Sequence, residues 1–401
     1  MAPDAAVAPA TTPPSEADVL HGARPSRQRV AFLDASRAVA IALATVSHGY
    51  RAFTDPSGFL GHPLEKYLYL AARAATPLFL VLFGMMVEWV YVRRAKSRGL
   101  GPVAGQMLKR SAQCYAGFLI IAAGAAVGTG RVSVLTDAVW MATTPGNSWI
   151  LKFYVVAIPV SIALVALRLR VGVWGIVGVA VVAWLADAPA MWIAERVPMG
   201  PFSDLLLGAG GGGLSVRHSL AFVAIGAVLA TSLLRDRERG GAPTVSFMKT
   251  GGLVLLGCGL AVVLAAALGE DMGSLPNRLV NGTLRGDNDI LYIVLGTALA
   301  LPVMIGLAAL EAPLQRGGVA LRVFVALGVS SLVAYAGGNA LLNALRGVEG
   351  MATDEFGLAV AMSLAFVALL AVAVWAFDAA RRRTALPKAA PVDPALHPPL
   401  G

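Results

Sequence analysis

Charged residues are scarce in this chain. Of its 401 residues, 14% are Asp, Glu, Lys or Arg, whereas 57% are hydrophobic and the mean hydropathy is +0.72. A typical soluble domain carries about 25% charged residues. The shortage therefore excludes an ordinary soluble globular domain and predicts an integral membrane protein.

Cysteine is equally rare, and no internal repeat is visible. Cys114 and Cys258 are the only two cysteines, and both fall in apolar segments. They exclude a disulfide framework and a cysteine-based metal site, so we expect neither a metal nor a bound cofactor. The net charge of +9 comes from basic residues at the ends of apolar segments. That placement predicts contact with membrane lipids and no nucleic-acid partner.

The apolar segments predict an all-α protein with about ten transmembrane helices, because a span needs about 20 apolar residues. The predicted spans are Val30–Tyr50, Tyr67–Val92, Gln106–Val127, Trp149–Leu167, Val171–Ile193, Val216–Leu234, Gly251–Leu268, Ile290–Leu310, Leu321–Leu345 and Phe356–Phe377. They form one membrane domain over residues 30–380. Residues 1–29 and 381–401, rich in Ala and Pro, are predicted to be disordered tails.

Charge placement gives these spans an orientation. Roughly twice as many Lys and Arg residues fall on the side of the N-terminus as on the opposite side, which by the positive-inside rule places both termini in the cytoplasm. The expected location is the cell (cytoplasmic) membrane, crossed several times.

The first span carries ionisable residues that are expensive to hold in a membrane and therefore indicate a functional site. Arg37 lies about 300° and His48 about 320° around the helix from Asp34, so all three share nearly one face. Arg37 and His48 are about 16 Å apart along the axis, which suits two ends of one elongated substrate. Arg37 can hold a phosphate or carboxylate, His48 is a candidate proton acceptor, and Asp34 can orient the guanidinium. The alternative is Asp34 and Arg37 neutralising each other at the headgroups.

Four further residues are candidates for substrate binding. Glu88 lies at a depth similar to that of Arg37 and either pairs near it or reaches the interface beside Arg93 and Arg94. Arg73 lies in the outer half of the second span. Arg217 and His218 open the sixth span at a depth similar to that of His48, as site residues or as interfacial anchors.

The densest basic cluster covers residues 93–98 together with Lys109 and Arg110. It predicts either a positively charged entrance for a phosphorylated donor or simple contact with headgroups that sets the topology. The Gly-rich stretch 208–213 does not sit between a strand and a helix, so it is not a nucleotide-binding motif.

The stretch from Phe32 to Ile41, with Asp34 and Arg37, and His48 eleven positions after the Arg, resembles the first-helix signature of the membrane acyltransferase-3 superfamily. Residues 75–84 and 327–332 resemble its second-helix and late Leu-Gly-x-x-Ser stretches. Relatives include bacterial O-acetyltransferases, OpgC-like glucan succinyltransferases and heparan-glucosaminide N-acetyltransferase-like proteins. This chain departs from the pattern at Ala38, usually Gly, and at Asn339, where many relatives have a His.

The resemblance implies an acyltransferase that takes an acyl group, most often acetyl, from cytoplasmic acyl-CoA and delivers it to a hydroxyl of a glycan or lipid-linked acceptor. It gives His48 the role of general base or transient acyl carrier, and Arg37 that of donor ligand. The competing interpretation is a transporter or flippase with a polar path through the membrane. The lack of inverted repeats, and the concentration of polar residues on the first two spans, argue against it.

Overall fold

The computed structural model describes residues 30–54, 60–196, 200–208, 214–238 and 244–384, and all regular structure in them is helical. The helices are α2 Ala31–Phe53, α3 Glu65–Ala72, α4 Ala75–Met86, the π-helix η1 Val87–Val92, α5 Arg93–Arg98, α6 Leu100–Thr129, α7 Ser133–Val139, α8 Trp149–Val171, α9 Val173–Leu185, α10 Asp187–Arg196, α11 Pro201–Leu207, α12 Val216–Glu238, α13 Val245–Ala267, α14 Leu275–Asn281, α15 Thr283–Gly286, α16 Ile290–Ala309, α17 Glu311–Arg316, α18 Val319–Val329, α19 Ser331–Leu345 and α20 Phe356–Thr384.

Within the described residues, seven helical stretches are long and apolar enough to cross a membrane, and two bent pairs raise the number to nine. The pairs are α9 with α10 and α18 with α19. Helix α2 is long enough at 23 residues, but its ionisable residues keep it out of this apolar set. Counting α2 gives the predicted ten, and the all-α, multi-pass membrane fold is confirmed.

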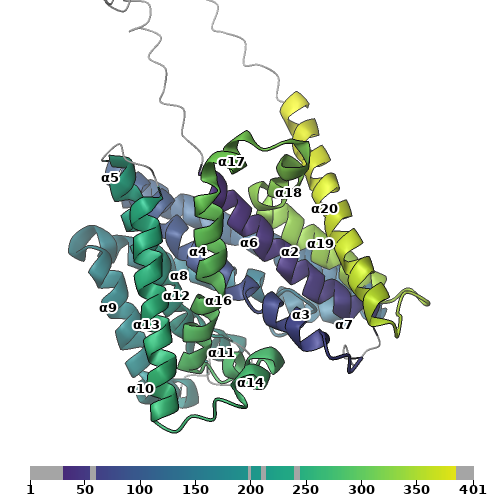
Figure 1. Ribbon diagram of the computed structural model, residues 1–401, viewed down its shortest axis with the longest axis horizontal. Helices are drawn as coiled ribbons and strands as arrows, with labels where there is room; N and C mark the ends of the chain where they lie inside the picture. Colours follow the sequence, from purple (N-terminus) through teal and green to yellow (C-terminus); the bar gives the residue numbers. More distant parts are fainter. Residues whose placement is uncertain (1–29, 55–59, 197–199, 209–213, 239–243, 385–401) are drawn as a thin grey trace, which may run out of the picture.

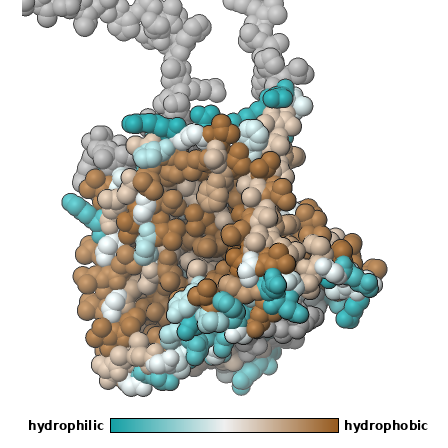
Figure 2. Space-filling view, turned by 45° about the vertical axis from the view of Figure 1, so that its right-hand side comes forward, coloured by the Kyte–Doolittle hydropathy of each residue, from teal (hydrophilic) through white to brown (hydrophobic). Residues whose placement is uncertain are grey.

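The positions of the two chain ends distinguish one end of the bundle from the other (Figure 1). Helix α2 begins and α20 ends at the same end, where α5 and α17 also lie. This end is called the basic end, because α5 and the last turn of α20 are rich in arginine. Hydrophobic side chains cover the middle of the face shown in Figure 2, and hydrophilic ones gather above and below it. The shape suits a protein spanning a bilayer, and the cytoplasmic orientation of the termini remains a prediction.

Helix α2 runs through the middle of the bundle, packed against α4, α18, α19 and α20. Helix α13 lies at the periphery, where only 11% of its most apolar stretch is buried. Helix α2, which carries Asp34, Arg37 and His48, is therefore shielded from lipid, whereas α13, whose only charged residue is Lys249 near its start, faces it. That arrangement follows from the cost of exposing charge to hydrocarbon.

Glycines allow the central helices to touch backbone to backbone. A Cβ on Gly84 of α4 would lie 2.2 Å from the carbonyl oxygen of Val223, and one on Gly226 of α12 would lie 2.1 Å from that of Val81. Close approach of this kind is how membrane helices gain packing energy without a hydrophobic driving force. Helix α4 is thereby fixed against α12, with its other face turned toward α2.

The fifth and ninth predicted spans are each wrong in one respect. The fifth, Val171–Ile193, is divided between α9 and α10, which meet at 68°. Residues Leu321–Leu345 do not form a straight helix, because α18 and α19 meet at Ser330 with a bend of 86°. The hydroxyl of Ser330 donates to Asp378 of α20 at 2.7 Å, which supports the break. The bend directs the start of α19 toward the interior of the bundle.

The predicted ends of the domain fall near the limits of the described residues. Helix α20 continues through its arginines to Thr384, a little beyond the predicted boundary at 380. Residues 1–29, 385–401 and most of the Gly-rich stretch, 209–213, lie outside the described residues.

Candidate active site

Helix α2 carries two of the predicted site residues into two different cavities. Arg37 lines one cavity and His48 lines another. The eleven residues between them correspond to about 16 Å of helix. The two side chains therefore lie in separate cavities, whereas the sequence predicted the two ends of one elongated site.

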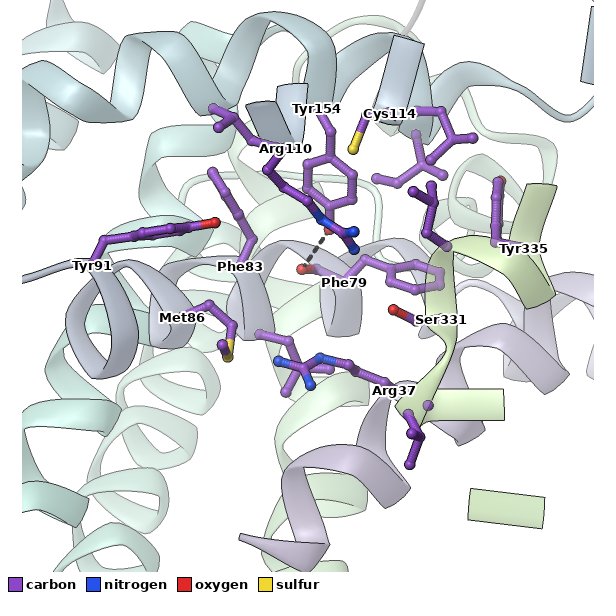
Figure 3. A pocket seen from close by; sticks show the side chains of 17 residues that line it. Arg37, Phe79, Phe83, Met86, Tyr91, Arg110, Cys114, Tyr154, Ser331 and Tyr335 are labelled. Carbon is purple, nitrogen blue, oxygen red and sulfur yellow. Dashed lines mark hydrogen bonds between the residues drawn. The ribbon is translucent and has the colours of Figure 1, made fainter. Parts of the chain in front are cut away.

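The cavity around Arg37, here called the Arg37 cavity, has a volume of about 320 Å³. Arg37 from α2 and Arg110 from α6 enter it from opposite sides, as Figure 3 shows. Its other walls are mainly apolar or aromatic: Phe79, Leu82, Phe83, Met86, Tyr91, Cys114, Ile150, Leu151, Tyr154, Ile158, Gly328, Val329, Ser331, Leu332 and Tyr335. Two guanidinium groups in an otherwise apolar space suit an amphiphilic anion.

Arg37 is held by a neighbour on its own helix. Its guanidinium donates to Asp34 at 3.1 Å, and Asp34 is buried. The predicted role of Asp34 in orienting the guanidinium agrees with this contact. A Cβ on Gly328 would lie 1.8 Å from the carbonyl oxygen of Asp34, so α18 touches the backbone of α2 beside the pair.

The cavity around His48, here called the His48 cavity, has a volume of about 230 Å³. It is lined by Ala44, Ser47, His48, Arg51, Tyr69, Ala72, Arg73, Ala75, Thr76, Phe79, Gly146, Asn147, Trp149, Ile150, Arg285, Tyr292 and Tyr335. Arg73, one of the candidates for substrate binding, therefore faces the same cavity as His48. Its guanidinium also donates to the carbonyl oxygen of Val280.

Three residues, Phe79, Ile150 and Tyr335, line both cavities and separate them. The rings of Phe79 and Tyr335 meet edge to face, with centroids 5.7 Å apart. The Tyr335 hydroxyl donates to the carbonyl oxygen of Asn147 at 2.9 Å, and the hydroxyl of Tyr154 donates to that of Phe79 at 3.0 Å. The separation is therefore only a few side chains thick, and hydrogen bonds hold it in place.

Asn339 fixes the imidazole of His48. The amide nitrogen of Asn339 donates to the carbonyl oxygen of Tyr335 at 2.8 Å, so its oxygen is the atom that faces His48, 2.6 Å from Nδ1. An amide oxygen only accepts, and Nδ1 must therefore carry the proton. In the neutral imidazole this bond selects the tautomer with the proton on Nδ1, which leaves the lone pair of Nε2 free. Asn339 thus contacts His48, at the position where the superfamily that the sequence resembles often has a His.

Glu88 has a partner that the sequence did not predict. It is buried in η1 and forms a two-pronged ion pair with Arg168 of α8, at 2.6 and 2.7 Å. The ion pair of Glu88 involves neither Arg37 nor Arg93 or Arg94, the partners that the sequence suggested. The pairing joins residues 80 positions apart, and Glu88 is not among the residues that line the Arg37 cavity.

Arg217 and His218 belong to a separate polar cluster. His218 contacts the hydroxyl of Ser215 at 2.7 Å and the guanidinium of Arg217 at 2.9 Å. Arg217 also donates to the carbonyl oxygens of Ala183 and Leu207. Neither residue lines the Arg37 or the His48 cavity, so the structure does not bring them together with His48.

Several lining residues were missed by sequence reasoning or given another meaning. Arg110 was predicted as part of the basic cluster, for which a donor entrance was one of two interpretations, and it lines the Arg37 cavity. Two other arginines of that cluster do not line it: Arg94 donates to Gln106, and Arg93 stacks on Trp89. Arg51 and Arg285 were counted only as charges on the weakly basic side. Because most Lys and Arg residues lie on the side of the N-terminus, the presence of these two arginines on the opposite side was the one sequence signal of a functional role.

One comparison with known proteins bears on this site. Residues 29–201 match the family described as heparan-alpha-glucosaminide N-acetyltransferase, catalytic. The match covers less than half of the chain and includes α2 and α6, which supply Arg37, His48 and Arg110, as well as Arg73 in the segment between α3 and α4. The comparison with curated proteins gives no match.

The protein is a membrane enzyme of the acyltransferase class, transferring groups other than aminoacyl groups, and that prediction is confirmed by the family match. The family matched is an acetyltransferase-type membrane family similar to this chain over those residues. The match does not specify the acyltransferase-3 superfamily, which the sequence resemblance had suggested.

Proposed function

We propose that the protein moves an acyl group, most simply acetyl, from acyl-CoA in the Arg37 cavity to a hydroxyl of a glycan or lipid-linked acceptor in the His48 cavity. The observation that carries this proposal is the single helix α2, which delivers Arg37 to one cavity and His48 to the other. The donor would enter from the basic end, which we take as the cytoplasmic face of the cell membrane.

The Arg37 cavity has the chemistry that an acyl-CoA requires. Arg37 and Arg110 offer bidentate donors to phosphate groups, while Phe83, Met86 and Leu332 offer apolar surface to the arm that carries the thioester. The thioester end would then lie at Phe79 and Tyr335, the residues that separate the two cavities.

His48 supplies the group that activates the acceptor. With Nδ1 protonated and bonded to Asn339, Nε2 can take the proton of an acceptor hydroxyl as that oxygen attacks the acyl carbon. The same free Nε2 also suits a transient acyl-imidazole, the second role expected for this residue. Both roles need the tautomer that Asn339 fixes, so the assignment of His48 does not depend on choosing between them.

The experiment is transfer of label from [14C]acetyl-CoA to membrane glycans and lipids. Wild type should transfer label, and His48→Ala should lose about a hundredfold or more of the rate, the usual contribution of general acid–base catalysis. His62→Ala is the matched control, because His62 lies on the surface and stacks on Phe356. Unchanged transfer by His48→Ala, at equal amounts of folded protein, would contradict the proposal.

The transporter alternative is tested by the same material. A transporter moves its cargo without releasing free CoA thiol, whereas the proposed enzyme releases one thiol for each acyl group transferred. Acceptor accumulation across vesicles with no thiol release would favour the transporter.

A further inference from the structure

Three arginines line the His48 cavity, and no carboxylate lines it. Arg51, Arg73 and Arg285 come from α2, the segment after α3, and α15. None of the three is paired with an Asp or Glu within the described part of the chain, where the ion pairs involve other residues. Grouped cations without a counter-charge are costly in a partly desolvated space, because each has lost water without gaining a partner.

The arginines are held in place by groups that carry no charge. The guanidinium of Arg285 lies 4.4 Å from the centre of the Trp149 ring, and that of Arg51 lies 5.2 Å from the centre of the Tyr69 ring. Stacking on an aromatic face positions a guanidinium while its N–H groups, which lie in its plane, point away from the ring. No carboxylate among the lining residues therefore compensates the positive charge of the cavity.

A fourth cation adds to the positive field. This cation is Arg346, which directly follows α19. Its pKa is lowered mainly by burial and, to a smaller extent, by the positive charge of Arg51. The sequence also places these residues on the sparsely basic side of the membrane, where arginine is otherwise avoided. Arginines gathered on that side call for an explanation other than topology.

We infer that the acceptor carries an anionic group, a carboxylate, sulfate or phosphate, which Arg51, Arg73 and Arg285 bind while its hydroxyl faces His48. This inference rests on the proposed acyl transfer, since it names the class of acceptor at the same site. A charge-assisted, bidentate contact from arginine suits all three anions. The anion would be borne by a soluble glycan or by a lipid, and the chemistry recognised is the same.

The test is binding in nanodiscs of phosphatidylcholine, without any acyl donor, using glucose 6-sulfate and glucose as paired probes. We expect wild type to bind glucose 6-sulfate about tenfold or more tighter than glucose, the effect of one good charge-assisted pair. Arg285→Gln and Arg51→Gln should reduce that preference to about threefold or less. Arg131→Gln is the matched control: Arg131 is exposed and lines neither cavity, so this change should leave the preference intact.

Equal binding of the two probes by wild type would overturn the inference. A preference that survives both Arg51→Gln and Arg285→Gln would do the same. Arg51 is the more exposed of the two, so Arg51→Gln keeps the test available if Arg285→Gln fails to fold. Arg285→Lys, which keeps the charge but not the fork of donors, should retain part of the preference.

A second arm identifies the source of the anion. In nanodiscs containing phosphatidylglycerol, weaker binding of glucose 6-sulfate would show that a lipid headgroup competes for the same arginines, which makes the anion lipid-borne. Unchanged binding would indicate a soluble acidic acceptor. Failure of acyl transfer is recognised separately: the sulfate preference would persist while no label leaves acetyl-CoA. Equal label transfer to neutral and acidic acceptors would overturn the anionic acceptor and leave acyl transfer standing.

Discussion

The Arg37 cavity and the His48 cavity share three residues and differ in almost everything else. The first is walled by aliphatic and aromatic side chains with two arginines, whereas the second collects three arginines, a histidine, an asparagine and several hydroxyls. The contrast indicates two ligands of different character, one amphiphilic and one strongly polar. A group that passes between them has to pass Phe79 and Tyr335.

The largest expected effect comes from breaking the frame that both cavities share. In Gly328→Val the new side chain would overlap the backbone of Asp34, where even a Cβ lies 1.8 Å from the oxygen. Backbone cannot move aside cheaply, so α18 should separate from α2 at a cost of about 3 kcal/mol or more. We expect most of the protein to be lost from the monodisperse fraction after detergent extraction.

The matched control for that change is Gly337→Val on α19, where a Cβ added to the glycine would have nothing within 4 Å of it. It should leave the thermal unfolding midpoint and transfer nearly unchanged. Similar losses in both variants would mean that the contact between α18 and α2 does not hold the two cavities together.

The next effect concerns the His48 cavity alone. Asn339→Leu removes the oxygen that holds Nδ1 of His48, so the imidazole can adopt the other tautomer and loses its orientation. We expect kcat to fall about tenfold to a hundredfold, with KM for acetyl-CoA changed little. Asn339→Asp keeps an oxygen acceptor and should recover part of kcat. A rise in the donor KM with kcat unchanged would contradict the positioning role.

The smallest effect concerns the Arg37 cavity. Arg110→Gln should raise KM for acetyl-CoA about tenfold, from the loss of one charge-assisted contact, while KM for the acceptor stays the same. Lys109→Gln, one position away and exposed, is the control and should change neither constant. An effect of Arg110→Gln on the acceptor constant would remove the distinction between the two cavities.

Local sequence patterns predicted the helices and the contacts within one helix. Apolar length located the long helices such as α2, α6 and α20, but not the short helices between them such as α11 and α14. Helical spacing predicted that Asp34 and Arg37 would meet. The bend at Ser330 was not predicted, because residues 321–345 are apolar enough on average to pass for a single span despite Ser330 and Ser331 within them. What breaks that run is tertiary: contact of Gly328 with α2 and the bond from Ser330 to Asp378.

Contacts between distant segments could not be predicted for the same reason. Glu88 has several arginines near it in the sequence, and only the packing of η1 against α8 selects Arg168. Asn339 was noticed where relatives have a His, but its bond to His48 depends on how α19 crosses α2. The resemblance pointed to His48, and the fold supplied its partner.

Helix α2 is continuous between Arg37 and His48, so its backbone fixes the distance between these two residues along the helix axis. A helix cannot be shortened without losing hydrogen bonds, so the spacing between the two side chains is set by its rise per residue and not by the adaptable lining of either cavity. Under the proposed function, a donor with its anionic group next to the acyl carbon, such as an acyl phosphate, is too short to occupy Arg37 and reach His48 together. Selection for a long-armed donor is then a matter of length, independent of which acyl group that arm carries.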